Sequence, residues 1–187
     1  MSARILPILC VLYVLSEAGL VWLKRSGKTA ADADRGSLPL IWLVISVSMA
    51  AAFGCANALP QLALGPAGIW RPAGLVVFVA GVVVRWYAIL SLGRFFTVNV
   101  AIAADHQLVE AGPYRWSRHP SYTGALLAFL GLGLCLDNWA SLAALLVPVS
   151  VVFWWRMRIE EAALLETFGE RYRDYMRRTR RLIPFIY

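Results

Sequence analysis

The sequence is short of the residues that hold metal sites and disulfide frameworks. Among 187 residues there are three cysteines and two histidines. Cys10, Cys55 and Cys135 each lie inside an apolar run, without CxxC spacing and without a histidine cluster nearby. We therefore expect small buried hydrophobic side chains, and neither a disulfide framework nor a metal site. The sequence also has no internal repeat and no low-complexity tract.

Charged residues are scarce too, at 16% of the chain, whereas 60% of the residues are hydrophobic. A soluble domain has about 45–50% apolar residues, so this chain cannot cover itself with polar surface. Its length leaves room for several spans of roughly 20 residues but for no separate soluble catalytic domain. The net charge of +7 requires no nucleic-acid partner, because basic residues that flank apolar spans are expected near anionic headgroups. We therefore expect any chemistry to take place within the membrane or at its surface.

Five apolar segments predict an all-α, polytopic membrane protein with about five transmembrane helices. They cover residues 5–23, 38–59, 69–92, 121–136 and 139–155. The first segment ends at Lys24 and Arg25, a stop-transfer pattern that favours a retained span over a cleaved signal peptide. We divide the chain into two N-terminal transmembrane helices in residues 1–68 and a core in residues 69–187.

The C-terminal part of the chain predicts a helical hairpin followed by an amphipathic helix. Only Asp137 and Asn138 separate the last two apolar segments, which indicates a tight turn. The first arm of this hairpin would be roughly 24 Å long, shorter than the approximately 30 Å hydrocarbon core. From Arg156 onward apolar residues recur at spacings of three or four between charged residues, which predicts an amphipathic cytoplasmic helix that ends before Pro184.

The distribution of basic residues predicts the orientation in the membrane. They concentrate after the first apolar segment, after the third segment and in the C-terminal tail, whereas the opposite side has little more than Arg4 and Arg71. With five spans, the positive-inside rule places the N-terminus outside and both the active site and the C-terminus in the cytoplasm. Because the termini are short, we expect the cell inner membrane of a prokaryote.

Polar residues that can do chemistry lie in two stretches on the inferred cytoplasmic side, 94–122 and 156–161. The hairpin should bring these stretches together, because the chain leaves the membrane close to where it entered. We therefore expect His119 to lie next to Glu160 and Glu161.

The sequence of these stretches resembles a known family. GPYRWSRHPSYTG at 112–124, the paired glutamates Glu160 and Glu161, and FGERY at 168–172 are similar to the isoprenylcysteine carboxyl methyltransferase family. The resemblance covers about half of the chain, residues 92–184. It implies a membrane-embedded enzyme that transfers a methyl group from S-adenosylmethionine to a lipophilic acceptor, with an isoprenylcysteine-type carboxylate as the acceptor that the family name suggests. It also implies a cofactor site without a Rossmann domain, and the sequence contains no GxGxxG fingerprint.

The resemblance implies a role for particular residues. Arg156 should face the substrate and, with Glu161, act in catalysis. Methyl transfer from a sulfonium to a carboxylate depends on positioning and water exclusion and needs no metal. An arginine can hold a carboxylate, and tyrosine rings can face the sulfonium cation. Contacts to S-adenosylmethionine are expected from Asn99, His106, Gln107, Leu108, Val109, Tyr114, His119, Pro120, Ser121, Tyr122 and Glu160.

Several alternatives remain open at this stage. The acceptor could be a phenolic lipid, another lipid acid, an amine or a thiol, and a phenol would need His119 or Glu161 as a base. A sterol-type reductase with a nicotinamide cofactor and a non-catalytic scaffold or transporter are the rival classes. Taken singly, Arg156 could be a membrane anchor, and Glu17 and Arg85, which lie inside apolar segments, are expected to snorkel to the interface. The expected partners are a lipophilic or prenylated substrate and membrane lipids, and the sequence does not set an oligomeric state.

Overall fold

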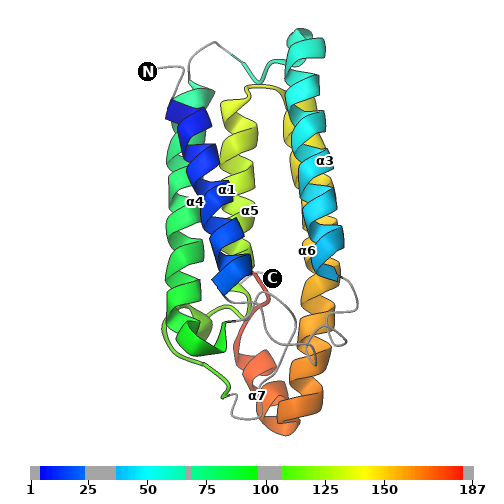
Figure 1. Ribbon diagram of the computed structural model, residues 1–187. Coiled ribbons are helices and arrows are strands. Elements are labelled where there is room, and N and C mark those ends of the chain that lie inside the picture. Colours follow the sequence, from blue (N-terminus) through cyan, green and yellow to red (C-terminus); the bar gives the residue numbers. More distant parts are fainter. Residues whose placement is uncertain (1–4, 24–36, 66–68, 97–106, 183–187) are drawn as a thin grey trace.

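The computed structural model describes residues 5–23, 37–65, 69–96 and 107–182, and these residues form a bundle of helices (Figure 1). The α-helices are α1 (Ile5–Leu23), α3 (Ser37–Ala58), α4 (Trp70–Leu92), α5 (Pro120–Cys135), α6 (Trp139–Phe168) and α7 (Glu170–Arg178). Short 3-10 turns are η1 (Pro60–Leu62), η2 (Gly93–Phe95) and η3 (Gly112–Arg115). The prediction of an all-α chain is confirmed for the described residues, in which extended pairing is limited to two isolated bridges.

Three helices within the described residues are long and apolar enough to cross a membrane. They are Ser37–Ala58, Trp70–Phe95 (α4 with η2) and Trp139–Phe168. The remaining apolar helices are shorter, at Cys10–Leu20 within α1 and Pro120–Cys135. The protein is therefore an integral membrane protein by the length and composition of these helices. The count of five spans stays a prediction.

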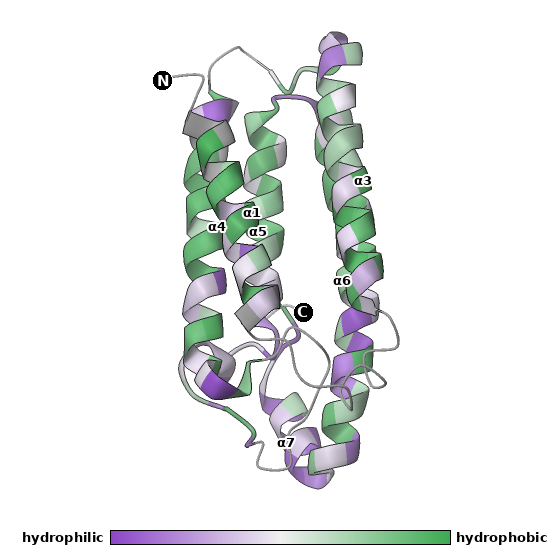
Figure 2. Cartoon of the chain, viewed as in Figure 1, coloured by the Kyte–Doolittle hydropathy of each residue, from purple (hydrophilic) through white to green (hydrophobic). Residues whose placement is uncertain are grey.

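The helices lie nearly side by side and alternate in direction (Figure 1). α4 packs along α5, α3 packs along α6, and α5 contacts α6. The first turn of α1 and the short helix α7 lie at opposite ends of the bundle. Hydrophobic residues cover the length of the bundle, and hydrophilic residues gather at the end where α7 lies (Figure 2). This polar end is where the candidate site residues meet.

The α4–α5 contact depends on glycines that face the opposite backbone. An added Cβ on Gly131 would lie 2.2 Å from the Phe78 nitrogen, and one on Gly81 would lie 2.3 Å from the Ala128 nitrogen. A Cβ on Gly74 or Gly124 would also meet the backbone of the other helix, at 2.6 and 2.4 Å. Small residues let membrane helices approach closely, so these glycines determine the distance between α4 and α5.

The predicted hairpin is confirmed, and two residues explain its turn. Asp137 has a φ of 54°, which lets the chain reverse between α5 and α6. Asn138 caps α6 by accepting a hydrogen bond from the Ser141 backbone nitrogen at 3.0 Å, and its own amide donates to the Leu59 carbonyl at 2.7 Å. The turn is thereby also attached to the end of α3.

The prediction of one continuous amphipathic helix from Arg156 onward is wrong in its boundaries. Residues 156–168 continue α6 without interruption. The helix ends at Gly169, which has a φ of 54°. A left-handed glycine is a common helix terminator, since it lacks a Cβ. The shorter α7 that follows is amphipathic: Tyr172 and Tyr175 are buried, whereas its arginines are exposed. The break turns α7 back beneath the polar end of the bundle.

Candidate active site

A cavity of about 210 Å³ lies inside the bundle at its polar end. One part of its wall is apolar and includes Tyr13, Val14, Ile41, Ile45, Met49 and Phe129 from α1, α3 and α5. The other part is polar and includes Arg118, His119, Tyr122, Arg156 and Glu160. A single cavity therefore offers a polar pocket and an apolar chamber that are continuous with each other.

Tyr122 connects two charged groups in the polar part of the cavity. Its hydroxyl donates to Glu160 Oε2 at 3.2 Å and accepts from Arg156 Nε at 3.1 Å. Its ring meets the Phe153 ring edge to face, with the ring centroids 5.1 Å apart. A carboxylate and a guanidinium, one turn apart on α6, are thus both held by one phenol of α5.

The histidine and the two glutamates lie together, as the hairpin predicted. His119 Nδ1 is 3.9 Å from Glu160 Oε2, and His119 Nε2 is 3.2 Å from Glu161 Oε1. His119 is buried at the N-cap of α5, and Pro120 follows as the first helical residue. Proline is favoured at this position because its missing N–H has no partner in a helix and its φ suits the helix. The first turn of α5 therefore brings His119 against α6.

Glu161, for which we predicted a catalytic role, lies beside the cavity. It is buried and is not among the described residues that line the cavity. Arg118 Nε donates to its carboxylate at 2.9 Å, and Arg181 forms an ion pair with it. With His119 on the same oxygen, the carboxylate is held by three groups, of which Arg118 and His119 line the cavity. This arrangement favours a positioning role for Glu161 in place of a catalytic one.

The chain after α7 holds the approach to α5 in place. The backbone nitrogens of Arg118 and His119 donate to the carbonyls of Arg180 and Arg181 at 2.8 and 3.0 Å, and the Arg180 nitrogen donates to the Trp116 carbonyl at 3.2 Å. Arg118 Nη1 also donates to the Thr179 carbonyl at 2.6 Å. No pattern in the sequence predicted these bonds, because they join residues more than 60 positions apart.

Arg156 is buried although it carries a charge, and only 4% of its surface is exposed. Arg156 donates from Nε to Tyr122, and it donates from Nη1 to the hydroxyl of Ser37, the first residue of α3. The N-terminal half of the chain therefore contributes directly to the polar cluster. Sequence reasoning missed Ser37, because a serine at the start of a helix is typical of ordinary capping.

Tyr114 lies in η3 and lines the cavity. Its carbonyl accepts a hydrogen bond from the Tyr175 hydroxyl at 2.7 Å, which ties η3 to α7. Burial raises the pKa of the Tyr114 hydroxyl, and the nearby Glu160 carboxylate raises it further, so the hydroxyl keeps its proton at neutral pH.

Some of the other predicted cofactor contacts line the cavity, some do not, and two lie outside the described residues. Leu108, Val109 and Ser121 line the cavity. Gln107 is exposed, and neither Gln107 nor Pro120 is among the described lining residues. Asn99 and His106 lie outside the described residues.

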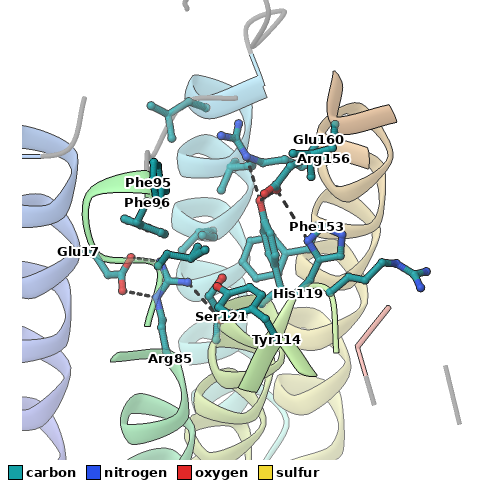
Figure 3. Close-up of a pocket in the computed structure, with 18 of the residues that line it drawn as sticks. Glu17, Arg85, Phe95, Phe96, Tyr114, His119, Ser121, Phe153, Arg156 and Glu160 are labelled. Carbon is teal, nitrogen blue, oxygen red and sulfur yellow. Dashed lines mark hydrogen bonds and ion pairs between the residues drawn. The ribbon is translucent and has the colours of Figure 1, made fainter. Parts of the chain in front are cut away.

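Glu17 and Arg85 also line the cavity and pair with each other, a contact that the expectation of snorkelling to the interface did not include. Arg85 Nε and Nη2 donate to the two oxygens of Glu17, each at 2.5 Å (Figure 3). The sequence did contain a signal for this pair: an acid and a base lie at similar depth in two apolar segments, and charges inside a membrane usually pair. Their pairing required knowing that α1 lies near α4.

The fold and the cavity define an all-helical integral membrane protein with a site between its helices that is polar in one part and apolar in the other. The model of the phospholipid methyltransferase family matches residues 70–171, more than half of the chain, and the protein belongs to this family. That range contains the hairpin, Arg156, Glu160 and Glu161.

Known relatives agree with the resemblance found in the sequence, which is confirmed. A protein-S-isoprenylcysteine O-methyltransferase of Tribolium castaneum is 39% identical over 115 residues, which are 60% of this chain and 41% of that protein. The corresponding protein of Saccharomyces cerevisiae is 36% identical over 115 residues, covering 48% of its length. The solved structure of the eukaryotic intramembrane Ras methyltransferase ICMT (isoprenylcysteine carboxyl methyltransferase) aligns with a TM-score of 0.66 and 33% identity. That alignment covers 79% of this chain and 53% of that one. The matched part thus spans about half the length of these relatives.

Proposed function

We propose that the protein transfers a methyl group from S-adenosylmethionine to a lipophilic acceptor that carries a carboxylate, such as an isoprenylcysteine. The observation that carries this proposal is the cavity, in which Arg156 and Glu160 adjoin an apolar chamber formed by membrane helices. The names of the relatives, protein-S-isoprenylcysteine O-methyltransferases, support it.

The chemistry of the polar part fits the methyl donor. S-adenosylmethionine has an ammonium, a carboxylate, ribose hydroxyls and a sulfonium. Glu160 offers a carboxylate whose side chain is 36% exposed, and it suits the ammonium or the ribose. The rings of Tyr114 and Tyr122 suit the sulfonium, because aromatic faces attract cations. We therefore assign the donor to the part of the cavity between η3, α5 and α6.

When bound, S-adenosylmethionine would supply an electrophilic methyl group. The residues of the chain would position the acceptor and exclude water, which is where the rate of such a displacement comes from. Arg156 would hold the acceptor carboxylate through its guanidinium, and Tyr122 would fix Arg156 relative to Glu160. Glu161, with Arg118 and Arg181, would keep His119 at the edge of the site. No base is required for a carboxylate acceptor.

The buried guanidinium of Arg156 favours an acid over an amine as the acceptor. A protonated amine would be repelled by Arg156, whereas a carboxylate can accept two parallel hydrogen bonds from it. The apolar chamber, with Ile41, Ile45 and Met49 in its wall, suits a hydrocarbon tail. The acceptor would enter sideways from the bilayer.

For the topology we propose that all five apolar helices cross the membrane, with the N-terminus outside and the site at the cytoplasmic face of a cell membrane. The support is the concentration of basic residues at the end where α7 lies. The short α5 would cross while shielded by α4 and α6, against which it packs.

Incubation of the purified protein with methyl-labelled S-adenosylmethionine and an isoprenylcysteine analogue tests the reaction. We expect a labelled methyl ester, from which alkaline hydrolysis releases the label as methanol. The Arg156→Ala variant should lose about a hundredfold in turnover, as expected when the acceptor is misplaced, while calorimetry shows retained cofactor binding.

Arg158→Ala is the matched control for this variant. Arg158 lies on the same helix, stacks over the exposed Trp154 ring at 5.0 Å and should be dispensable. If Arg156→Ala lost cofactor binding and turnover equally, the acceptor role of Arg156 would be refuted. Absence of cofactor binding by the unmodified protein would refute the methyl transfer itself.

A further inference from the structure

The ion pair between Glu17 and Arg85 lies between two apolar helices, where a contact between apolar side chains would cost less free energy. Their side chains are 14% and 15% exposed, and both oxygens of Glu17 accept from the planar fork of Arg85. Charged side chains inside membrane segments are costly, and they usually serve function. This pair is absent from the set of residues that the family resemblance assigns to the cofactor or substrate.

The pair holds a helix that has few other attachments among the described residues. Val11, Leu12, Val14 and Leu15 of α1 are each at least 50% exposed. The described contacts of α1 with the core include an edge-to-face contact between the rings of Tyr13 and Phe78, with centroids 5.8 Å apart, and the packing of Cys10. The Glu17–Arg85 pair is therefore a strong, directional attachment of α1 to α4 near the site.

The same pair is part of the cavity wall and touches the start of α5. Arg85 Nη1 donates to the Ser121 carbonyl at 3.3 Å, and Ser121 lies between His119 and Tyr122 in sequence (Figure 3). Tyr13 and Val14, one turn before Glu17, line the apolar chamber. The position of α1 therefore decides whether that side of the chamber is closed.

We propose that Glu17 and Arg85 are positioning residues whose ion pair holds α1 as the wall of the acceptor chamber. The inference rests on the function proposed above, because it takes the apolar part of the cavity as the place of the acceptor tail. With the pair intact, the tail is enclosed between α1 and α3, and the carboxylate is aligned with Arg156. Without it, α1 moves away and the chamber opens to lipid. The donor part of the cavity, formed by η3, α5 and α6, keeps its shape.

Kinetics of Glu17→Gln in the full-length protein test whether the pair affects the acceptor and leaves the methyl donor unaffected. The substitution keeps the size of the side chain and removes its charge, so one partner of a buried pair is lost. We expect the acceptor KM to rise about tenfold or more, the Kd for S-adenosylmethionine to stay within about twofold, and kcat at saturating acceptor to be largely retained. The reversed pair, Glu17→Arg with Arg85→Glu, should recover most of the acceptor affinity that either single reversal loses.

The position of α1 can be measured without any turnover. Spin labels on Leu15→Cys and Leu43→Cys, both exposed positions on α1 and α3, report the distance across the chamber in a background without the three native cysteines. We expect a narrow distance distribution in the protein with the intact pair and a broader, longer one with Glu17→Gln. Ser16→Ala is the control, because the Ser16 hydroxyl bonds to the Tyr13 carbonyl of its own helix at 2.7 Å.

Unchanged acceptor KM together with an unchanged distance distribution in Glu17→Gln would overturn the proposal. A parallel loss of cofactor and acceptor affinity would overturn it as well, since the pair would then support the whole fold. Failure of the proposed function is distinguishable from both outcomes: the unmodified protein would transfer no label, while the spin-label distances would still show whether the pair holds α1.

Discussion

At the residue scale, the polar groups of the site mostly provide partners for one another. Tyr122 joins Glu160 to Arg156, and Glu161 joins His119 to Arg118. Buried polar groups are costly unless they are hydrogen-bonded, so such networks fix their members in one arrangement. The Tyr172 hydroxyl is an exception, because it is buried and has no hydrogen-bond partner among the described residues.

The contrast between two tyrosines of α7 leads to a prediction about stability. Tyr172→Phe removes a hydroxyl that makes no bond, so the stability of the unliganded protein should stay the same or rise by about 1 kcal/mol. Burial raises the pKa of Tyr172, and so do the nearby carboxylates Glu161 and Glu160, so this hydroxyl is neutral at physiological pH and its removal changes no charge. Thermal unfolding in detergent without ligand is the measurement.

Tyr175→Phe serves as the control on the same helix. It removes the 2.7 Å bond to the Tyr114 carbonyl and should destabilise the protein by about 1–3 kcal/mol, since that carbonyl is left buried without its donor. Equal destabilisation by the two substitutions would show that the Tyr172 hydroxyl has a partner of its own in the unliganded protein.

At the scale of helices, the close approach of α4 and α5 brings the Arg85 side chain to the first turn of α5. Arg85 is the residue that a Cβ on Gly124 would strike, with the Arg85 nitrogen 2.4 Å away. Backbone contact between the two helices is therefore what places the Ser121 carbonyl within reach of Arg85. Larger residues in place of the glycines between α4 and α5 would move the Ser121 carbonyl away from Arg85.

Gly131→Ala should consequently destabilise the bundle. Its added methyl group would meet the backbone of α4 at 2.2 Å, and backbone cannot rotate away as a side chain can. We expect a loss of about 1–3 kcal/mol, typical of overpacking, measured as a lower unfolding temperature and a weaker resistance to denaturing detergent.

Gly54→Ala in α3 is the matched control, because an added Cβ there meets nothing within 4 Å. Alanine is the better helix former, so this variant should be as stable as the unmodified protein or slightly more so. If both substitutions had the same effect, the close contact of α4 with α5 would not be what limits stability.

At the scale of the whole molecule, the chain crosses the bundle repeatedly and returns its C-terminal part to the site. α7 and the residues after it contact η3 and the start of α5, so segments about 60 residues apart in sequence meet at the site. The first turn of α1 lies at the far end of the bundle from α7 (Figure 1). An odd number of crossings would place these two ends on opposite sides of the membrane.

A reporter fused after Tyr187 tests that topology. With five spans and the basic residues in the cytoplasm, a fluorescent reporter that folds only in the cytoplasm should be active there, and an alkaline phosphatase fused at the same point should be inactive. A phosphatase fused before Met1, with its own export signal, should be active. The reverse pattern at Tyr187 would contradict the predicted number of spans.

The helices, the hairpin and the approach of His119 to the paired glutamates could be predicted, because each depends on residues close in sequence. The lengths of the apolar runs predict the helices, and a two-residue turn between α5 and α6 requires the two helices to run antiparallel. The break at Gly169 could have been found too, since a glycine inside a helical pattern is a common terminator. It was missed because the apolar spacing of three or four continues on both sides of it.

The sequence by itself determined the class of the protein, the order of its helices and which polar stretches meet, since these follow from hydrophobicity, periodicity and short turns. Only the tertiary structure decided which partner each buried charge has. Glu17 and Arg85 are 68 residues apart, and Ser37 and Arg156 are 119 apart. Such pairings depend on which helix faces lie against each other, and that is set by packing over the whole bundle. The same packing placed Arg118, His119 and Arg181 around the Glu161 carboxylate and made α1 part of the cavity wall.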